Sequence, residues 1–109
     1  MEKIYNKLVR DNVPEIIRQN KAEPKTRILE QEEFLKALFR KLEEEAKEAV
    51  EAGADKQALM KEIGDVYEII DAIIDNCGLS REEIMKLKNE RKMACGGFKK
   101  RVFLESVNN

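Results

Sequence analysis

The fold is decided by residues 31–76, QEEFLKALFRKLEEEAKEAVEAGADKQALMKEIGDVYEIIDAIIDN. Apolar side chains recur here every three or four residues, which predicts two amphipathic helices, over residues 31–52 and from about residue 56 to residue 76. Gly53 is well placed to end the first helix, and Asp55 is well placed to cap the second. Because their connection is short, the two helices should pack antiparallel.

Shorter helices are predicted on both sides of this pair. One begins at Asp11 or Asn12, has Pro14 in its first turn, and runs to about residue 20. Another begins at the capping box Ser80–Glu83 and runs to about residue 93.

The predicted fold class is therefore all-α, with one domain over residues 1–109. It consists of an antiparallel helical hairpin and shorter flanking helices. So small a hairpin buries little apolar surface, and we expect oligomerisation, at least to a homodimer, to complete the bundle.

The composition excludes several classes of protein. The 21 basic and 22 acidic residues nearly balance, which argues against a protein that coats nucleic acid. The apolar runs are too short to cross a membrane, and the charged N-terminus lacks the apolar run of a signal peptide. We therefore expect a cytoplasmic protein without nucleic-acid or membrane partners.

Residue types also limit the chemistry. The absence of histidine argues against zinc hydrolases and against Ser-His-Asp and Cys-His mechanisms. Cys77 and Cys95 lack the spacing of a metal or redox pair, so we expect free thiols, with Cys77 buried. Tyr67 and Phe98 fit either a hydrophobic core or stacking on a base. Carboxylates, lysines, arginines and a hard metal remain as the available catalytic groups.

Four carboxylates are predicted to converge. Glu45 and Glu48, and likewise Glu62 and Asp65, are three residues apart and so share a helix face. At about 100° per residue, Glu45 and Glu62 are displaced in the same sense from their apolar stripes. In an antiparallel pair all four therefore point to one edge. Oxygen-only clusters suit Mg²⁺ or Mn²⁺.

Each pair alone is typical of solvated glutamates in a charged helix, but two pairs in register favour a metal site. One of Glu44, Glu45 and Glu48 is expected to be the general base, with Glu44 and Glu45 as the catalytic residues. Without metal the carboxylates should repel one another, so we expect Asp65→Asn to stabilise the metal-free protein.

Substrate phosphates need cations besides the metal. The candidates cluster in the N-terminal block, on the fourth helix and after the paired glycines: Lys7, Arg10, Lys88, Arg91, Lys92 and Arg101. The Gly96-Gly97 pair fits two readings, a plain chain reversal or a backbone approach to an anion.

The motifs resemble a known family. Glu44-Glu45-Ala46-Lys47-Glu48, followed by Glu62-Ile63-Gly64-Asp65, is similar to the EExxE…ExxD signature of the MazG-like all-α nucleoside triphosphate pyrophosphohydrolases. Tyr5–Asp11 and Val13–Ile17 resemble the N-terminal block of a small subgroup often labelled phosphoribosyl-ATP pyrophosphohydrolase-like, and Gly96-Gly97-Phe98 with Arg101 resembles its C-terminal block. The subgroup usually has arginine where this chain has Cys95.

This resemblance implies a helical dimer or tetramer that binds Mg²⁺ through Glu45, Glu48, Glu62 and Asp65, with Glu44 at or beside the metal. It implies hydrolysis of a nucleoside triphosphate between the α- and β-phosphates, giving a monophosphate and pyrophosphate. Two alternatives stay open: a dedicated phosphoribosyl-ATP pyrophosphohydrolase of histidine biosynthesis, and a non-catalytic helical dimerisation or regulatory module.

Overall fold

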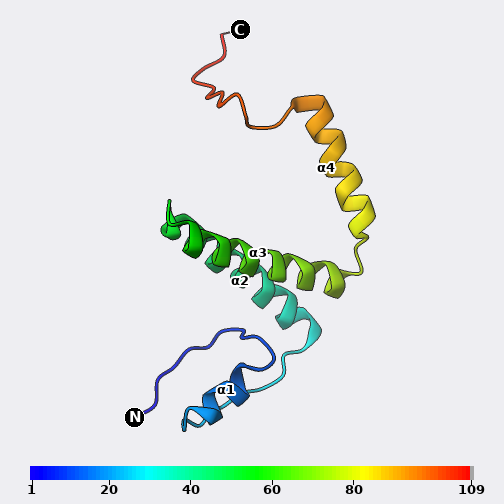
Figure 1. The fold of residues 1–109 in the computed structure, drawn as a ribbon. Helices are drawn as coiled ribbons and strands as arrows, with labels where there is room; N and C mark the ends of the chain where they lie inside the picture. Colours follow the sequence, from blue (N-terminus) through cyan, green and yellow to red (C-terminus); the bar gives the residue numbers. More distant parts are fainter. Residues whose placement is uncertain (109) are drawn as a thin grey trace. The chain divides into compact units, whose positions relative to one another are not determined.

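The structure is a computed structural model that describes residues 1–108. Four α-helices follow one another, and these residues contain no β-strand, which confirms the all-α class (Figure 1). They fall into two compact units, Met1–Cys77 and the chain from Gly78 onward. A single domain over residues 1–109 stays a prediction. Within residues 1–108, no helix is long and apolar enough to cross a membrane.

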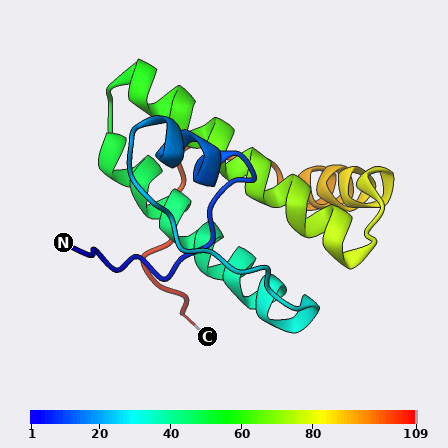
Figure 2. The same ribbon diagram turned by 90° about the horizontal axis from the view of Figure 1, so that it is seen from below.

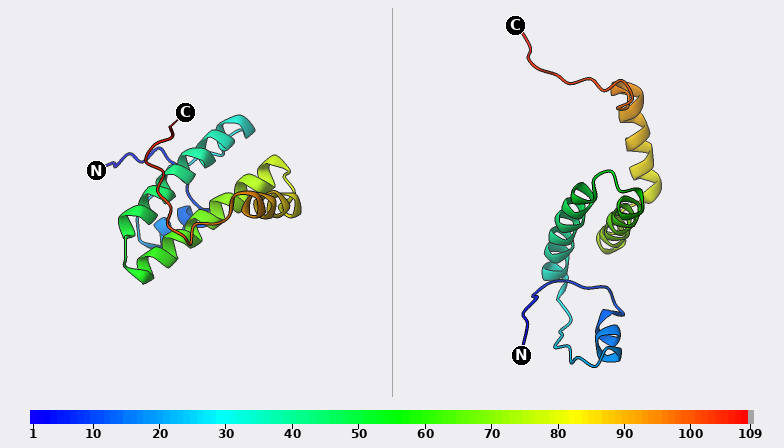
Figure 3. Two further views of the ribbon diagram at one scale, coloured as in Figure 1. Left: turned by 90° about the horizontal axis from the view of Figure 1, so that it is seen from above. Right: turned by 60° about the vertical axis from the view of Figure 1, so that its left-hand side comes forward.

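Two long helices, α2 (Gln31–Ala52) and α3 (Lys56–Cys77), form the body of the first unit. They pack along each other in opposite directions (Figures 2 and 3). Gly53 ends α2 with a φ of 58°, a conformation that glycine adopts without strain. Asp55 caps α3 as predicted, since its Oδ1 accepts a hydrogen bond from the Ala58 N–H at 3.2 Å.

The apolar core of this pair is small. The buried hydrophobic side chains of the described residues are Leu38 on α2 and Ile69 and Ile74 on α3. Other apolar residues of the predicted stripes, among them Phe39 and Ile63, are well exposed. Each helix therefore carries a wider apolar face than the other one covers.

The first unit begins with residues 1–12, which form no helix, and continues into α1 (Val13–Gln19). Asn12 stands at the N-cap, but within the described chain its side chain makes no capping hydrogen bond, so the predicted side-chain cap is wrong. Backbone groups begin this helix instead: the Val13 N–H donates to the Arg10 carbonyl at 3.0 Å, and the Ile16 N–H donates to the Asn12 carbonyl at 3.1 Å. Arg10 is thereby tied to the start of α1.

The second unit contains α4 (Arg81–Cys95) and the chain that follows it. Ser80 caps α4 as predicted, because its Oγ accepts from the Glu83 N–H at 3.1 Å. The helix ends at Gly96, which has a φ of 83° and donates its N–H to the Lys92 carbonyl at 2.8 Å. Gly96 thus ends the helix, and its N–H is not available to an anion.

The structure corrects one expectation about a single side chain and narrows two others. Cys77 and Cys95 are free thiols, as predicted, but Cys77 is exposed because it is the last residue of α3. Tyr67 and Phe98 are also exposed, at 66% and 97%, so neither belongs to the core. Tyr67 lies on a side of α3 that α2 does not cover.

Candidate metal centre

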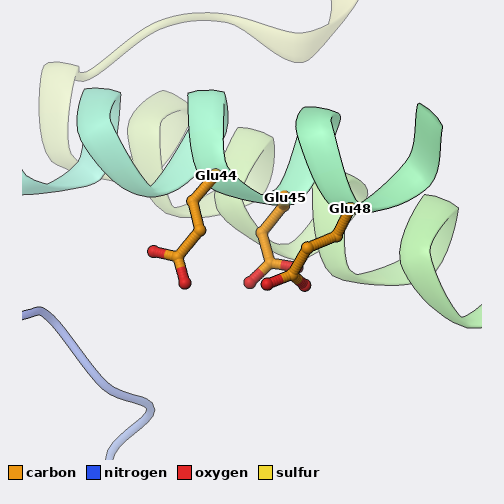
Figure 4. Close-up of side chains that lie close together, drawn as sticks. All are labelled: Glu44, Glu45 and Glu48. Carbon is orange, nitrogen blue, oxygen red and sulfur yellow. The ribbon is translucent and has the colours of Figure 1, made fainter. Parts of the chain in front are cut away.

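The predicted carboxylates come together on one side of α2 and α3. Oxygens of Glu44, Glu45 and Glu48 lie within 4.8 Å of one another, and so do oxygens of Glu45, Glu62 and Asp65. Figure 4 shows the three α2 side chains projecting from the same side of the helix, with the carboxylates of Glu45 and Glu48 close together. Glu45 belongs to both groups and joins them into one cluster, which we call the carboxylate cluster.

Two oxygens in this cluster are buried without a hydrogen-bond partner. Glu45 is only 7% exposed, and among the described residues it is the one charged residue that is buried. Its Oε2 and the Oε2 of Glu62 have no partner within residues 1–108. Burying an unpaired carboxylate oxygen costs free energy, so such oxygens are normally paired or bind a metal. A set of close, oxygen-only ligands with two buried oxygens fits Mg²⁺ or Mn²⁺.

Two lysines of the same helices pair with four other oxygens of the cluster. Lys41, only 16% exposed in its side chain, places Nζ 3.5 Å from Glu45 Oε1 and 3.7 Å from Glu44 Oε1. Lys61 Nζ lies 3.0 Å from Asp65 Oδ2 and 3.4 Å from Glu62 Oε1. Sequence reasoning missed both, although spacings of three and four residues to the glutamates and to Asp65 were available as the signal.

The N-terminal segment adds two more cations. Lys7 Nζ lies 3.5 Å from Glu44 Oε1, and Arg10 Nη2 donates a hydrogen bond of 2.8 Å to Asp65 Oδ1. Both residues were predicted from the sequence to bind phosphate, and the structure brings both to the carboxylate cluster. The other four predicted phosphate ligands belong to the second unit and are exposed there: Lys88, Arg91, Lys92 and Arg101. Their part in the site stays a prediction.

Glu48 lies close to two other carboxylates of the cluster. Its partial burial, together with the neighbouring carboxylates of Glu45 and Glu62, raises the pKa of Glu48 above its usual range. Asp65 differs from Glu48 in having cations beside it: Arg10 and Lys61 each pair with one of its oxygens. The pKa of Lys61 is correspondingly raised by Asp65 and Glu62. The metal-free cluster therefore has a neutralised end at Asp65 and a repulsive end at Glu48.

A pocket of about 490 Å³ adjoins the cluster. It lies between the N-terminal segment, α1 and the α2–α3 pair, and Arg10 and Lys41 contribute to its wall. Most of its other lining side chains are apolar: Leu8, Val9, Val13, Ile16, Phe34, Leu38 and Ala72. An apolar recess beside clustered charges is a common form of site for a small molecule with a charged end.

No protein-family model, curated protein or solved structure matches this chain. The carboxylate cluster, its cations and the adjoining pocket are therefore the observations on which a function has to rest, together with the sequence motifs.

Proposed function

We propose that this protein is a nucleoside triphosphate pyrophosphohydrolase that depends on Mg²⁺ or Mn²⁺. The observation that carries the proposal is the pair of buried, partnerless oxygens, Glu45 Oε2 and Glu62 Oε2, within a cluster of close carboxylates. The resemblance of the two acidic motifs to the MazG-like signature supports the same chemistry. The residues that would hold the metal are Glu45, Glu48, Glu62 and Asp65.

When bound, a divalent cation would polarise phosphate oxygens and acidify water. The chain's own residues supply the remaining functions. Glu44 is the more exposed carboxylate beside buried Glu45, and Lys7 and Lys41 hold its Oε1. We assign Glu44 the role of general base, since it combines access to solvent with contact with the cluster. The Lys41 ammonium lies 3.5 Å from Glu45 Oε1 and pairs with that carboxylate.

The reaction balances without a further reactant. A water oxygen attacks one of the two phosphorus atoms that flank the α–β bridging oxygen, and Glu44 accepts the water proton. The bond from that phosphorus to the bridging oxygen breaks, which releases a nucleoside monophosphate and pyrophosphate. Lys7 and Arg10 neutralise charge on the phosphates, and the apolar pocket receives the nucleoside. That Lys88, Arg91, Lys92 and Arg101 bind phosphate stays a prediction from the sequence.

A second copy of the chain is part of the proposal. Met60, Ile63, Tyr67 and Ile70 follow one another on α3 at spacings of three, four and three residues, and all are exposed. These four residues share one face of α3. Together with the exposed Phe39 and Val50 of α2, they form a surface that we call the apolar face. Phe39 lies nine residues from Glu48, about 180° around α2, so this face is opposite the carboxylate cluster.

The size of the apolar face suits a dimer. Two helices of 22 residues are each about 33 Å long, and side by side they present roughly 660 Å². A standard interface takes about 800 Å² from each partner. Two copies joined through this face make a four-helix bundle and leave both carboxylate clusters on the outside.

The test is pyrophosphate release by the full chain from a panel of ribo- and deoxyribonucleoside triphosphates and phosphoribosyl-ATP. We expect release with Mg²⁺ or Mn²⁺ and none with EDTA. Activity restricted to phosphoribosyl-ATP would identify the dedicated enzyme of histidine biosynthesis. The proposal is wrong if no nucleotide yields pyrophosphate with either metal, and a non-catalytic module would then be favoured.

A further inference from the structure

The N-terminal segment contacts the cluster through an exchangeable cation. Arg10 is 57% exposed in its side chain, and its contact with Asp65 spans 55 residues of sequence. Lys41 and Lys61 differ from it, since each pairs with carboxylates on its own helix. An exposed ion pair of this kind contributes little stability and is easily exchanged.

The ion pair between Arg10 and Asp65 cannot persist unchanged when Asp65 binds a metal ion. Its Oδ1 accepts from Arg10 and its Oδ2 accepts from Lys61, so both oxygens are in use. A divalent cation on Asp65 would lie close to the guanidinium and repel it. Guanidinium groups pair with phosphate oxygens in the same two-pronged way as with carboxylates, so Arg10 has a second partner available when a nucleotide is bound.

We propose that Arg10 is an exchangeable counter-ion that couples metal loading to nucleotide binding. It pairs with Asp65 while that carboxylate binds no metal, leaves it when Asp65 becomes a metal ligand, and then pairs with a phosphate of the nucleotide. The hydrogen bond from the Val13 N–H to the Arg10 carbonyl ties this residue to α1, so the exchange is a side-chain movement beside the pocket. This inference rests on the proposed function.

The experiment compares Arg10→Gln with Arg18→Gln in the full chain. Arg18 is a matched control because it pairs with Glu15 on α1 and not with the cluster. Free Mn²⁺ is measured by electron paramagnetic resonance during titration without nucleotide. We expect Arg10→Gln to bind Mn²⁺ about two- to fivefold more tightly than the unchanged protein, because an exposed ion pair no longer competes. Arg18→Gln should bind Mn²⁺ as the unchanged protein does.

A second titration, with a non-hydrolysable α,β-methylene nucleotide at saturating Mn²⁺, completes the test. Here Arg10→Gln should bind the nucleotide about tenfold less tightly, since a charge-assisted contact with phosphate is lost. Arg10→Lys keeps the charge but loses the two-pronged geometry, so its affinity for the nucleotide should lie between those of the unchanged protein and Arg10→Gln. Circular dichroism confirms that each variant is folded.

Two results would separate the failure of this inference from that of the proposed function. If Arg10→Gln binds Mn²⁺ no more tightly than the unchanged protein, Arg10 does not compete for Asp65 and the exchange is wrong, whereas the metal site stands. If neither protein binds Mn²⁺, the proposed function is wrong, and this inference fails with it.

Discussion

The two units of the chain differ in how many buried residues and how much of the candidate site they contain. The first, Met1–Cys77, has two packed helices, the buried hydrophobic residues and the whole carboxylate cluster. The second, from Gly78 onward, has one well-capped helix in which no residue of the described chain is buried. Four of the predicted phosphate ligands lie in this unit, but its described residues hold no group of three or more carboxylates close enough to share a metal ion. The groups on which the proposed reaction depends therefore lie in the first unit.

The largest effect should follow from a change at the centre of the cluster. Glu45→Gln removes the buried charge that both carboxylate groups share. A metal ion contributes several kcal/mol to such a reaction, so we expect turnover to fall about 1000-fold or more. Glu43→Gln is the control, since Glu43 is exposed on the same helix and lies outside both groups of the described chain. Equal pyrophosphate release by Glu45→Gln and Glu43→Gln would refute the assignment.

The next effect concerns the apolar face. Ile63→Asp places a charge in the middle of the proposed interface and should convert a dimer into a monomer at micromolar concentration. Sedimentation equilibrium measures the mass. Ile28→Asp is the matched control, because Ile28 is an exposed isoleucine in the segment before α2 and outside the apolar face. A monomeric unchanged protein, or equal dissociation in both variants, would contradict this interface.

A smaller effect distinguishes the two ends of the cluster. Glu48→Gln should raise the Tm of the metal-free protein by a few degrees, because it relieves repulsion with Glu45 and Glu62. Asp65→Asn should lower it, because Arg10 and Lys61 lose their partner. The same chemical change is made in both variants, so each controls for the other. Melting curves in EDTA that shift in the same direction would show that the two ends do not differ.

The two cations on Asp65 argue for the opposite sign to the sequence-based expectation that Asp65→Asn stabilises the metal-free protein, and the melting curves decide between the two. Helix periodicity predicts that the carboxylates share an edge, and the structure agrees. Helix periodicity does not predict which carboxylates the long, flexible side chains of lysine and arginine contact. The contact between Arg10 and Asp65 depends on how a segment without helix lies on α3, which no local pattern encodes.

The smallest effect is expected in the second unit, where Cys95 stands in place of the arginine usual in the resembling subgroup. Cys95→Arg should lower the KM for the nucleotide about two- to fivefold and leave kcat unchanged, if an arginine here pairs with phosphate. Cys77→Arg adds the same charge at another exposed cysteine and serves as the control. Equal KM values for the two variants would mean that position 95 makes no phosphate contact.

Most of the helical framework could be predicted from the sequence. Gly53 and the caps at Asp55 and Ser80 have local causes, namely a positive φ and a side-chain oxygen near free N–H groups. The exposure of Cys77 and Tyr67 could not be predicted, because an apolar stripe shows which face avoids water and not which part of that face a single chain covers. The same holds for α4 in the second unit, where the exposure of the apolar residues Leu87 and Met93 could not be predicted either.

The most direct measurement of the central claim is ³¹P NMR of the products formed from a nucleoside triphosphate by the full chain with Mg²⁺. The account predicts resonances of the monophosphate and pyrophosphate in equal amounts, their loss in EDTA, and their absence with Glu45→Gln. Diphosphate and orthophosphate as products, or the same products at the same rate in EDTA, would contradict it.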